Sequence, residues 1–279
     1  MAHPLAHARS FLFVPADRPQ RHVRALASGA DAVIVDFEDA VAPDRKAAAR
    51  DGFALPGADL PRVLLRINAC GTPWHDGDLA VAARLAGEGL GGVMLPKAER
   101  AADLARVAEA LGPQAVLVPL IESAAGLAAV DEIAAVPGVR RLAFGHLDFQ
   151  ADLGLACEAD ESELVPVRLA LVLASRRAGL APPIDGVTPD WRDTQRLAAE
   201  ARRARRGGFG AKLCIHPDQV ATVHAALSPS AEELAWARRV RAAIDAAGGG
   251  VANLDGRMVD APVVRLAERL LAQAGQGMG

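Results

Sequence analysis

Short apolar segments alternate with longer segments of helical character along most of the chain. The apolar segments span residues 11–16, 32–39, 62–68, 91–97, 115–123, 140–149, 182–187 and 210–217. Several of them are continuously apolar, such as Val-Ile-Val at 33–35, which is typical of strands buried on both faces of a parallel sheet. The segments between them are rich in good helix formers and often end at glycine. The pattern predicts about eight strand–helix units.

About eight such units favour a (β/α)8 TIM barrel over residues 9–227, because this fold typically takes about 250 residues. The alternative is a doubly wound sheet, which usually carries a glycine-rich phosphate-binding turn after its first strand. The first turn here, Pro-Ala-Asp-Arg-Pro at 15–19, has no such glycines. We therefore predict the barrel.

Residues 228–279 follow the eighth predicted strand and are expected to form a C-terminal helical extension. The segment SPSAEE at 228–233 is typical of a helix N-terminus, and the glycines at 248–250 predict a break. The pattern leaves two roles open. The helices either pack against the bottom of the barrel or form a lid or arm that reaches a neighbouring subunit.

Composition narrows the classes of function. Lys plus Arg is 31 and Asp plus Glu is 34, so the net charge is −3, and tyrosine is absent; neither favours nucleic-acid binding. The three cysteines are far apart, which favours neither a zinc site nor a disulfide framework. No apolar run approaches about 18 residues, and the N-terminus lacks the apolar core of a secretory signal. These observations predict a cytoplasmic protein that binds neither nucleic acid nor membrane.

Charged and polar residues follow most of the predicted strands, at the barrel end where catalytic groups gather. They are Asp36, Glu38, Asp39, Arg66, Asn68, Lys97, Glu122, Asp148, Asp185 and His216. Charges at the ends of buried strands are costly unless they are paired or liganded. The six carboxylates in this set would repel one another, and a bound cation is the simplest compensation.

Glu122 and Asp148 follow neighbouring strands, so we expect their side chains to meet across the barrel mouth. Two carboxylates with open coordination positions suit Mg²⁺, which keeps several waters and accepts substrate oxygens. No cluster of histidines or cysteines favours a softer metal. In the alternative interpretation, each carboxylate caps the following helix or pairs with a lysine.

Some of the cationic candidates also have two interpretations. Arg66 ends a buried strand, where a planar fork could bind a carboxylate or stabilise an oxyanion, or could pair with the acids at 36–39. Lys97 is expected to form a structural ion pair, and His216 is expected to be a hydrogen-bonded core histidine. Three arginines recur at a spacing of three residues: Arg18, Arg21 and Arg24. They form either a solvated helix face or an anion site for a nucleotide phosphate.

Motifs occur in order from about residue 9 to residue 275: RSFLFVPADRP, GADAVIVDFEDAVAPDRKAAAR, LLRIN, LPKAE, PLIESAAG, FGHLDFQADLG, IDGV, IHPDQ, SPSAEE and GRMVDAP. Together they resemble the citrate lyase beta-subunit-like family of the HpcH/HpaI aldolase superfamily, whose members are acyl-CoA carbon–carbon lyases. The resemblance implies a TIM barrel with a C-terminal extension, assembled as a homo-oligomer, a trimer or hexamer.

The resemblance also implies roles for the residues at the barrel mouth. Glu122 and Asp148 match the two acids that bind Mg²⁺, and Glu122 thereby belongs to the substrate site. Arg66 matches the arginine that contacts the acyl group of the substrate. Glu38 and Asp39 match an acidic pair that holds metal-bound waters.

Three further positions have implied roles. Arg18 and Arg24 match basic positions that bind the phosphates of coenzyme A. Asp260, in the GRMVDAP motif, matches an acid/base residue that the C-terminal extension contributes to a neighbouring subunit's site.

The implied reaction is Mg²⁺-dependent cleavage of a 3-hydroxy-3-carboxyacyl thioester, of the citryl-, malyl- or citramalyl-CoA type, to acetyl-CoA and an oxo acid. Thioester hydrolysis, a metal-dependent pyruvate aldolase and a subunit active only in a larger complex are the alternatives. Related aldolases tend to carry a histidine after the acid that ends the second strand. This chain reads DFEDAV there, without a histidine, which disfavours the aldolase. The sequence leaves open which acyl group is cleaved and whether the carrier is coenzyme A or an acyl carrier protein.

Overall fold

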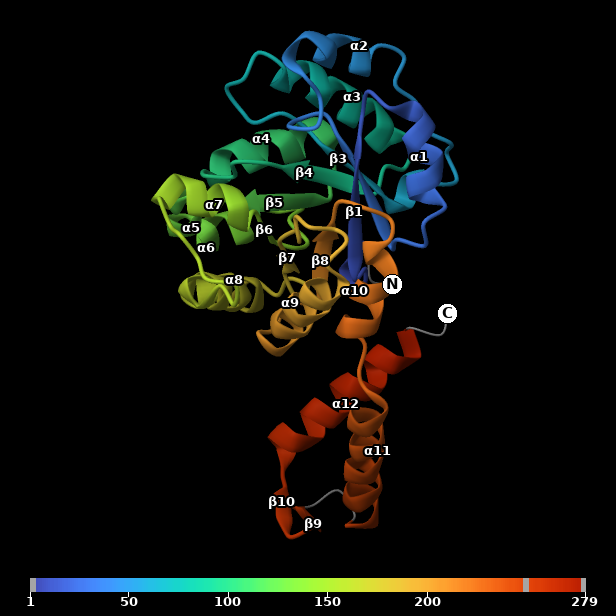
Figure 1. Ribbon diagram of the computed structural model, residues 1–279, viewed down its shortest axis with the longest axis vertical. Coiled ribbons are helices and arrows are strands. Elements are labelled where there is room, and N and C mark those ends of the chain that lie inside the picture. Colours follow the sequence, from blue (N-terminus) through green and yellow to red (C-terminus); the bar gives the residue numbers. More distant parts are fainter. Residues whose placement is uncertain (1–3, 248–250, 277–279) are drawn as a thin grey trace. The chain divides into compact units, whose positions relative to one another are not determined.

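The protein is described by a computed structural model, which covers residues 4–247 and 251–276 (Figure 1). Its first part is a closed parallel barrel of eight strands in sequence order. The strands are β1 (Ser10–Pro15), β2 (Ala32–Asp36), β3 (Val63–Arg66), β4 (Gly92–Leu95), β5 (Leu117–Ile121), β6 (Ala143–Phe144), β7 (Ile184–Asp185) and β8 (Ala211–Cys214). The predicted (β/α)8 barrel is confirmed.

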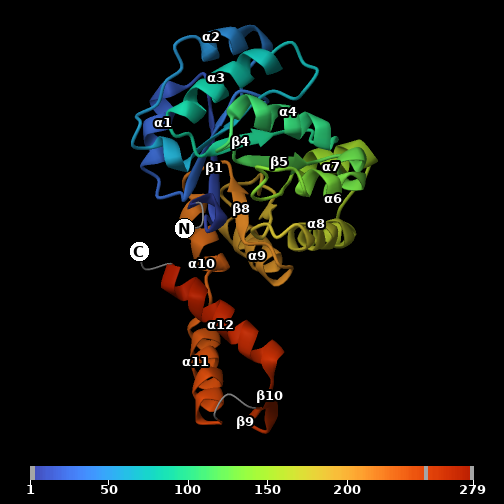
Figure 2. The ribbon, with the colours of Figure 1, turned by 180° about the vertical axis from the view of Figure 1, so that it is seen from behind.

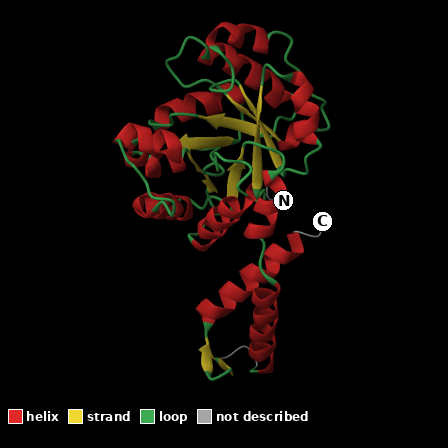
Figure 3. Ribbon diagram, in the orientation of Figure 1, coloured by secondary structure: helices red, strands yellow, loops and turns green. Residues whose placement is uncertain are grey.

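Helices enclose the barrel strands (Figure 3). They are α1 (Pro19–Leu26), α2 (Lys46–Arg50), α3 (His75–Gly87), α4 (Ala101–Leu111), α5 (Ala124–Ala128), α6 (Val130–Ala134), α7 (His146–Leu153), α8 (Val165–Arg177), α9 (Thr194–Arg206) and α10 (Gln219–Leu227). Short 3-10 turns lie at Pro4–Ala6, Pro43–Arg45, Leu60–Arg62 and Ser162–Leu164. None of the described helices is long and apolar enough to cross a membrane.

The register of the parallel strands sets which side chains meet at the barrel mouth. Asp36, the last residue of β2, is paired with Arg66, the last residue of β3. At the other side of the barrel, Ile121 of β5 is paired with Phe144 of β6, so Glu122 and Gly145 leave the sheet at the same level. Buried apolar side chains such as Phe11, Ile34 and Leu64 fill the interior below.

The apolar run at 140–149 predicts a longer strand than the one that forms. Only residues 143–144 pair as β6, and α7 begins at His146. The backbone N–H of Gly145 still donates to Ile121 O, and the helix then closes as the Phe149 N–H donates to Gly145 O. Asp148 therefore lies in the first turn of a helix and not at a strand end, because an apolar run cannot distinguish a strand from a short buried helix.

The chain divides into two compact units, residues 1–224 and 225–279. The second unit contains α11 (Ala231–Ala246), the antiparallel strands β9 (Ala252–Leu254) and β10 (Arg257–Val259), and α12 (Ala261–Gln276). A capping box of Ser230 and Glu233 begins α11. Figure 2 shows α12 crossing α11. The unit has its own buried apolar cluster, which includes Ala237 and Val240.

The helical extension predicted after the barrel is thus present. The predicted break at 248–250 lies outside the described residues. The predicted domain limits, 9–227 and 228–279, and a lid function for the extension stay predictions.

Candidate active site

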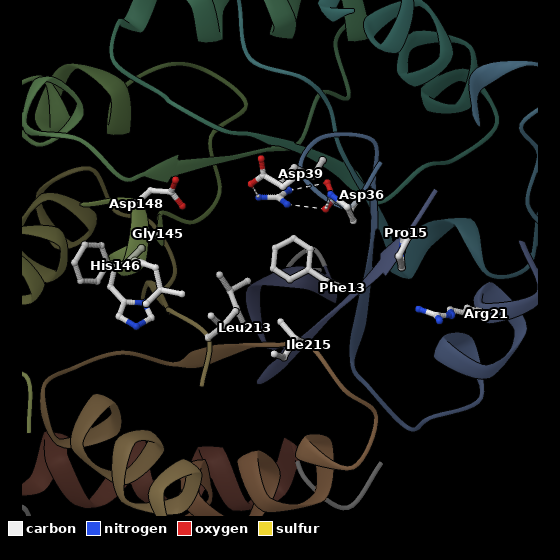
Figure 4. A pocket seen from close by; sticks show the side chains of 15 residues that line it. Phe13, Pro15, Arg21, Asp36, Asp39, Gly145, His146, Asp148, Leu213 and Ile215 are labelled. Carbon is white, nitrogen blue, oxygen red and sulfur yellow. Dashed lines mark hydrogen bonds and ion pairs between the residues drawn. The ribbon is translucent and has the colours of Figure 1, made fainter. Parts of the chain in front are cut away.

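A cavity of about 420 Å³ opens at the carboxyl ends of the barrel strands (Figure 4). It is lined by residues at or just beyond the ends of β1, β2, β3, β6, β7 and β8. In Figure 4, Asp36, Asp39 and Asp148 lie along one side of the cavity, and Leu213 and Ile215 lie along the other. The cavity is acidic on one wall and apolar on the opposite one.

Arg66 is held rigidly on the acidic wall. Its Nε donates to Asp36 Oδ1 at 2.8 Å and its Nη2 donates to Asp36 Oδ2 at 2.6 Å, a bidentate pair. Its Nη1 lies 3.0 Å from Glu38 Oε2 and 3.4 Å from Asp39 Oδ2. The ion pair with the acids at 36–39, which the sequence left open, is therefore present, and Nη1 is the nitrogen that Asp36 does not engage.

Lys97 links two of the acids. Its Nζ donates to Glu38 Oε1 at 3.2 Å, and its backbone N–H donates to Glu122 Oε1 at 2.7 Å. The expected structural ion pair of Lys97 is thus present. Lys97 has a φ of 48°, in the left-handed region that residues other than glycine rarely adopt. Such strain persists only where surrounding contacts enforce it, which is common at functional sites.

Glu122 is buried, with 4% of its surface exposed. Burial is the largest cause that raises the pKa of Glu122, to about 8; the Lys97 amide opposes this shift, and the negative charge of Asp148 adds to it. Burial likewise raises the pKa of Glu38, against the opposing charge of Arg66. Burial thus disfavours the charged form of both carboxylates, although Arg66 and Lys97 already pair with Glu38, and a further cation at this mouth would favour the charged form.

Asp148 is exposed and lines the cavity three residues after Gly145. Gly145 packs directly against Glu122, and a Cβ at Gly145 would stand 2.5 Å from Glu122 Oε2. The fold thus brings the Glu122 carboxylate against the loop that starts α7. Among the residues that the structure describes, no group of three or more His, Cys, Asp or Glu side chains is arranged to hold a metal. An ion on Glu122 and Asp148 would therefore need water or substrate oxygens to complete its coordination.

Gly145→Ala is expected to disrupt this carboxylate pair. The added Cβ would overlap Glu122 Oε2 and force the buried side chain to move. We expect divalent-metal affinity to fall about 10-fold or more, as for other displaced ligand contacts, measured by Mn²⁺ titration of the purified protein. Gly87→Ala at the end of α3, where no atom lies within 4 Å of the new Cβ and the backbone is not left-handed, is the matched control for the glycine change. Unchanged Mn²⁺ affinity in folded Gly145→Ala would contradict the pairing.

Arg18, which precedes α1, and Arg21 and Arg24 within it have different surroundings. All are exposed, and Arg18 lies 3.6 Å from Asp17. Arg21, and neither Arg18 nor Arg24, lines the cavity, at its edge near Pro15 (Figure 4). The spacing of three residues indicated a shared helix face. Which of the three arginines reaches the cavity depends on how α1 packs beside the barrel.

Two other positions differ from expectation. His216 is not a core histidine: it is partly exposed, its ring stacks on Trp191 at 3.9 Å, and its Nδ1 accepts from the backbone of Asp218. The reason is that β8 ends at Cys214, so His216 lies in the loop beyond it. His146, which sequence reasoning did not select, lines the cavity although only 3% of its surface is exposed. Asp260 lies in the second unit, where its Oδ1 is 3.4 Å from the Val263 N–H at the start of α12.

The barrel and the charged cavity at the carboxyl ends of its strands define a TIM-barrel protein with an enzyme-like site. The sequence profile of the HpcH/HpaI aldolase/citrate lyase family matches residues 9–217. The chain belongs to this family of enzymes, and the family resemblance drawn from the motifs is confirmed.

Similar proteins match nearly the whole chain. A citrate lyase subunit beta-like protein of Mycobacterium tuberculosis is 41% identical over 95% of both chains. A (3S)-malyl-CoA thioesterase of Cereibacter sphaeroides is 36% identical, over 98% of this chain and 97% of the relative. An L-malyl-CoA/beta-methylmalyl-CoA lyase of the same species is 34% identical, over 98% and 96%.

The fold also matches a solved structure. The crystal structure of CitE from Mycobacterium tuberculosis in complex with magnesium, acetoacetate and coenzyme A superposes with a TM-score of 0.84. It is 38% identical and covers 97% of this chain and 99% of its own. The barrel with its C-terminal helices is therefore shared with CitE.

Proposed function

We propose that this protein is a Mg²⁺-dependent carbon–carbon lyase that cleaves a 3-hydroxy-3-carboxyacyl-CoA thioester to acetyl-CoA and an oxo acid. The observation that carries the proposal is the approach of Glu122 to the loop that presents Asp148, in a cavity that the fixed guanidinium of Arg66 also lines. Magnesium and coenzyme A in the CitE complex support the same chemistry.

The residues present fit a magnesium ion. Glu122 is buried with a raised pKa, and its carboxylate lies against the loop that leads to Asp148. Two carboxylates with room for water and substrate oxygens are the donor set that Mg²⁺ favours. When bound, the ion supplies Lewis acidity to the substrate hydroxyl as that group becomes a carbonyl, a contribution of several kcal/mol. We propose that Glu38 and Asp39 hold waters of the same ion.

Arg66 is the proposed donor to the thioester enolate that leaves when the carbon–carbon bond breaks. Asp36 engages Nε and Nη2, which fixes the guanidinium plane, and Nη1 lies 3.0 Å from Glu38 Oε2 and 3.4 Å from Asp39 Oδ2. We propose that the developing negative oxygen binds at Nη1 in competition with these two acids. A donor that is already oriented costs little reorganisation, and loss of one such donor typically lowers the rate by about 10²–10³. The enolate carbon then takes a proton, and we propose Asp260 of a neighbouring subunit as the acid, in a homo-oligomer.

The carrier would enter past α1. Arg21 of α1 lines the edge of the cavity; Arg24 is exposed on the same helix, and Arg18 is exposed just before it. Charge-assisted contacts from these arginines suit the phosphates of coenzyme A. We propose coenzyme A as the carrier and the cytoplasm as the location.

The apolar wall favours particular acyl groups. The carbon that bears the hydroxyl carries a hydrogen in malyl, a methyl in citramalyl and a carboxymethyl in citryl thioesters. The wall opposite the acids contains Leu213 and Ile215 (Figure 4), and the guanidinium of Arg66 is already paired with carboxylates. A second carboxylate against this wall would lack a partner, which is unfavourable. We therefore propose malyl- or citramalyl-CoA as the substrate.

A screen of synthetic thioesters tests the proposal. Purified protein with Mg²⁺ is expected to release acetyl-CoA together with glyoxylate or pyruvate, and to cleave citryl-CoA with a kcat/KM about 10²-fold lower. Omission of Mg²⁺ with added chelator should remove the activity. Cleavage of citryl-CoA at an equal kcat/KM would contradict the acyl preference, and absence of any oxo acid product would contradict the lyase.

Thioester hydrolysis is the second candidate, because the malyl-CoA thioesterase is as similar to this chain as the malyl-CoA lyase. Hydrolysis of malyl-CoA yields malate and free coenzyme A, and no acetyl-CoA. The same screen therefore separates the two reactions by their products.

A further inference from the structure

A cluster of buried charges next to the cavity is not used by the proposed reaction. At its centre is Glu161, which is 5% exposed and precedes the 3-10 turn before α8. Glu161 Oε2 accepts from Arg168 Nη2 at 2.5 Å and from Arg203 Nη2 at 2.7 Å. Its other oxygen, Oε1, lies 3.4 Å from His146 Nε2. One carboxylate thus joins α8, α9 and the first residue of α7.

The cluster is costly for the fold. Glu161 has φ 50° and ψ 40°, a left-handed backbone conformation in a residue other than glycine. Arg168 Nη1, Arg203 Nε and Asp185 Oδ2 are buried and have no hydrogen-bond partner. Strained backbone and partly satisfied buried charges are both unfavourable for stability. Their presence together beside a cavity points to a purpose other than stability.

His146 connects the cluster to the cavity. Its ring packs between Glu161 and Gly186, and a Cβ at Gly186 would stand 2.1 Å from His146 Nδ1. His146 also lines the cavity, and it is the first residue of α7. Asp148 lies two residues later in the same helical turn. The contacts that hold His146 in place therefore act on the same helical turn that carries Asp148.

We propose that Glu161 is a positioning residue of the active site, which holds His146 against Gly186 and so fixes the first turn of α7 with Asp148 facing the metal position. The inference rests on the proposed function, because it assigns Asp148 to the metal. Glu161 itself touches neither substrate nor metal. Gly186 serves the same purpose at the Nδ1 atom of the ring, where a Cβ would overlap it, which explains a glycine in the IDGV segment.

Mn²⁺ binding to the full-length protein, followed by electron paramagnetic resonance, tests the inference without reference to turnover. Glu161→Gln keeps the side-chain volume and removes the charge, and we expect its Mn²⁺ affinity to fall about 10-fold, as for other residues that orient metal ligands. Glu163→Gln is the matched control, because Glu163 is exposed two residues away, and its affinity should equal that of the unsubstituted protein.

Gly186→Ala provides a second route that leaves every charge in place. Its Cβ displaces the His146 ring, and we expect a loss of Mn²⁺ affinity similar to that of Glu161→Gln. Because Glu161 balances two arginines, Glu161→Gln is also expected to unfold at a lower temperature, so binding is measured well below its melting point. A purely structural role would lower the melting temperature and leave the Mn²⁺ affinity of the folded protein unchanged.

The outcomes separate the two levels of inference. If the unsubstituted protein binds Mn²⁺ and either folded variant binds it equally well, the positioning role alone is overturned. Unsubstituted protein that does not bind Mn²⁺ overturns the metal assignment of the proposed function, and the positioning role with it. Weakened binding in a folded variant, with Glu163→Gln unchanged, is the expected result.

Discussion

Asp148→Ala is expected to lose at least about 10³-fold of the Mg²⁺-dependent cleavage rate while the barrel stays folded. The side chain is exposed in the first turn of α7, so its truncation removes no core packing. It does remove one of the two proposed carboxylate ligands, and the Lewis acidity of a metal contributes several kcal/mol to such a reaction. The rate is measured as acetyl-CoA and oxo acid release at saturating Mg²⁺, with circular dichroism to check the fold.

Glu132→Ala is the matched control for Asp148→Ala. Glu132 is an exposed acid on α6 that does not line the cavity, so the variant changes the net charge equally and should retain full activity. Turnover of Asp148→Ala close to that of the unsubstituted protein would contradict the metal assignment.

Mixed oligomers of Asp260→Ala and Arg66→Ala are expected to recover activity that neither variant has alone. If Asp260 serves a neighbouring subunit's cavity, a site is complete when an intact barrel meets an intact extension. Random assortment of equal amounts gives about one quarter complete sites in a cyclic assembly. The recovery is measured as turnover after the two proteins are unfolded and refolded together, against each refolded separately.

Subunit exchange must be verified for this comparison, for example by mass spectrometry of differently labelled chains. Arg66→Ala leaves Asp36 with an unpaired buried charge, so Arg66→Lys, which keeps the charge but loses the bidentate pair, is the second variant. Absence of recovery in assemblies proven to be mixed would count against a role for Asp260 in trans.

Much of the site follows from strand ends that the sequence already indicates. Continuously apolar runs identify the barrel strands, and the residues that follow these runs, Arg66 and Glu122 among them, are thereby expected at the barrel mouth. The pairing of Arg66 with Asp36 was one of two interpretations, because both bonding to the acids and binding to substrate suit a guanidinium at that position. The register of β2 against β3 decided it, since the register sets the two residues side by side.

Other features depend on contacts between segments that are far apart in the chain. Arg18, Arg21 and Arg24 have the same spacing and chemistry, yet only Arg21 lines the cavity. His216 fits the pattern of a core histidine, but β8 ends before it. The sequence does not indicate the proposed role of Glu161, because the residues that Glu161 contacts, Arg203 and His146, are 42 and 15 positions away.

By itself, the sequence determined the barrel, its family and the acidic residues at the strand ends, because apolar periodicity and local motifs are properties of neighbouring positions. The tertiary structure alone decided which charges are paired, which arginine reaches the cavity and which glycines make room for Glu122 and His146. Those features depend on distances of a few ångströms between separate elements, and such distances are set only when the strands align and the helices pack.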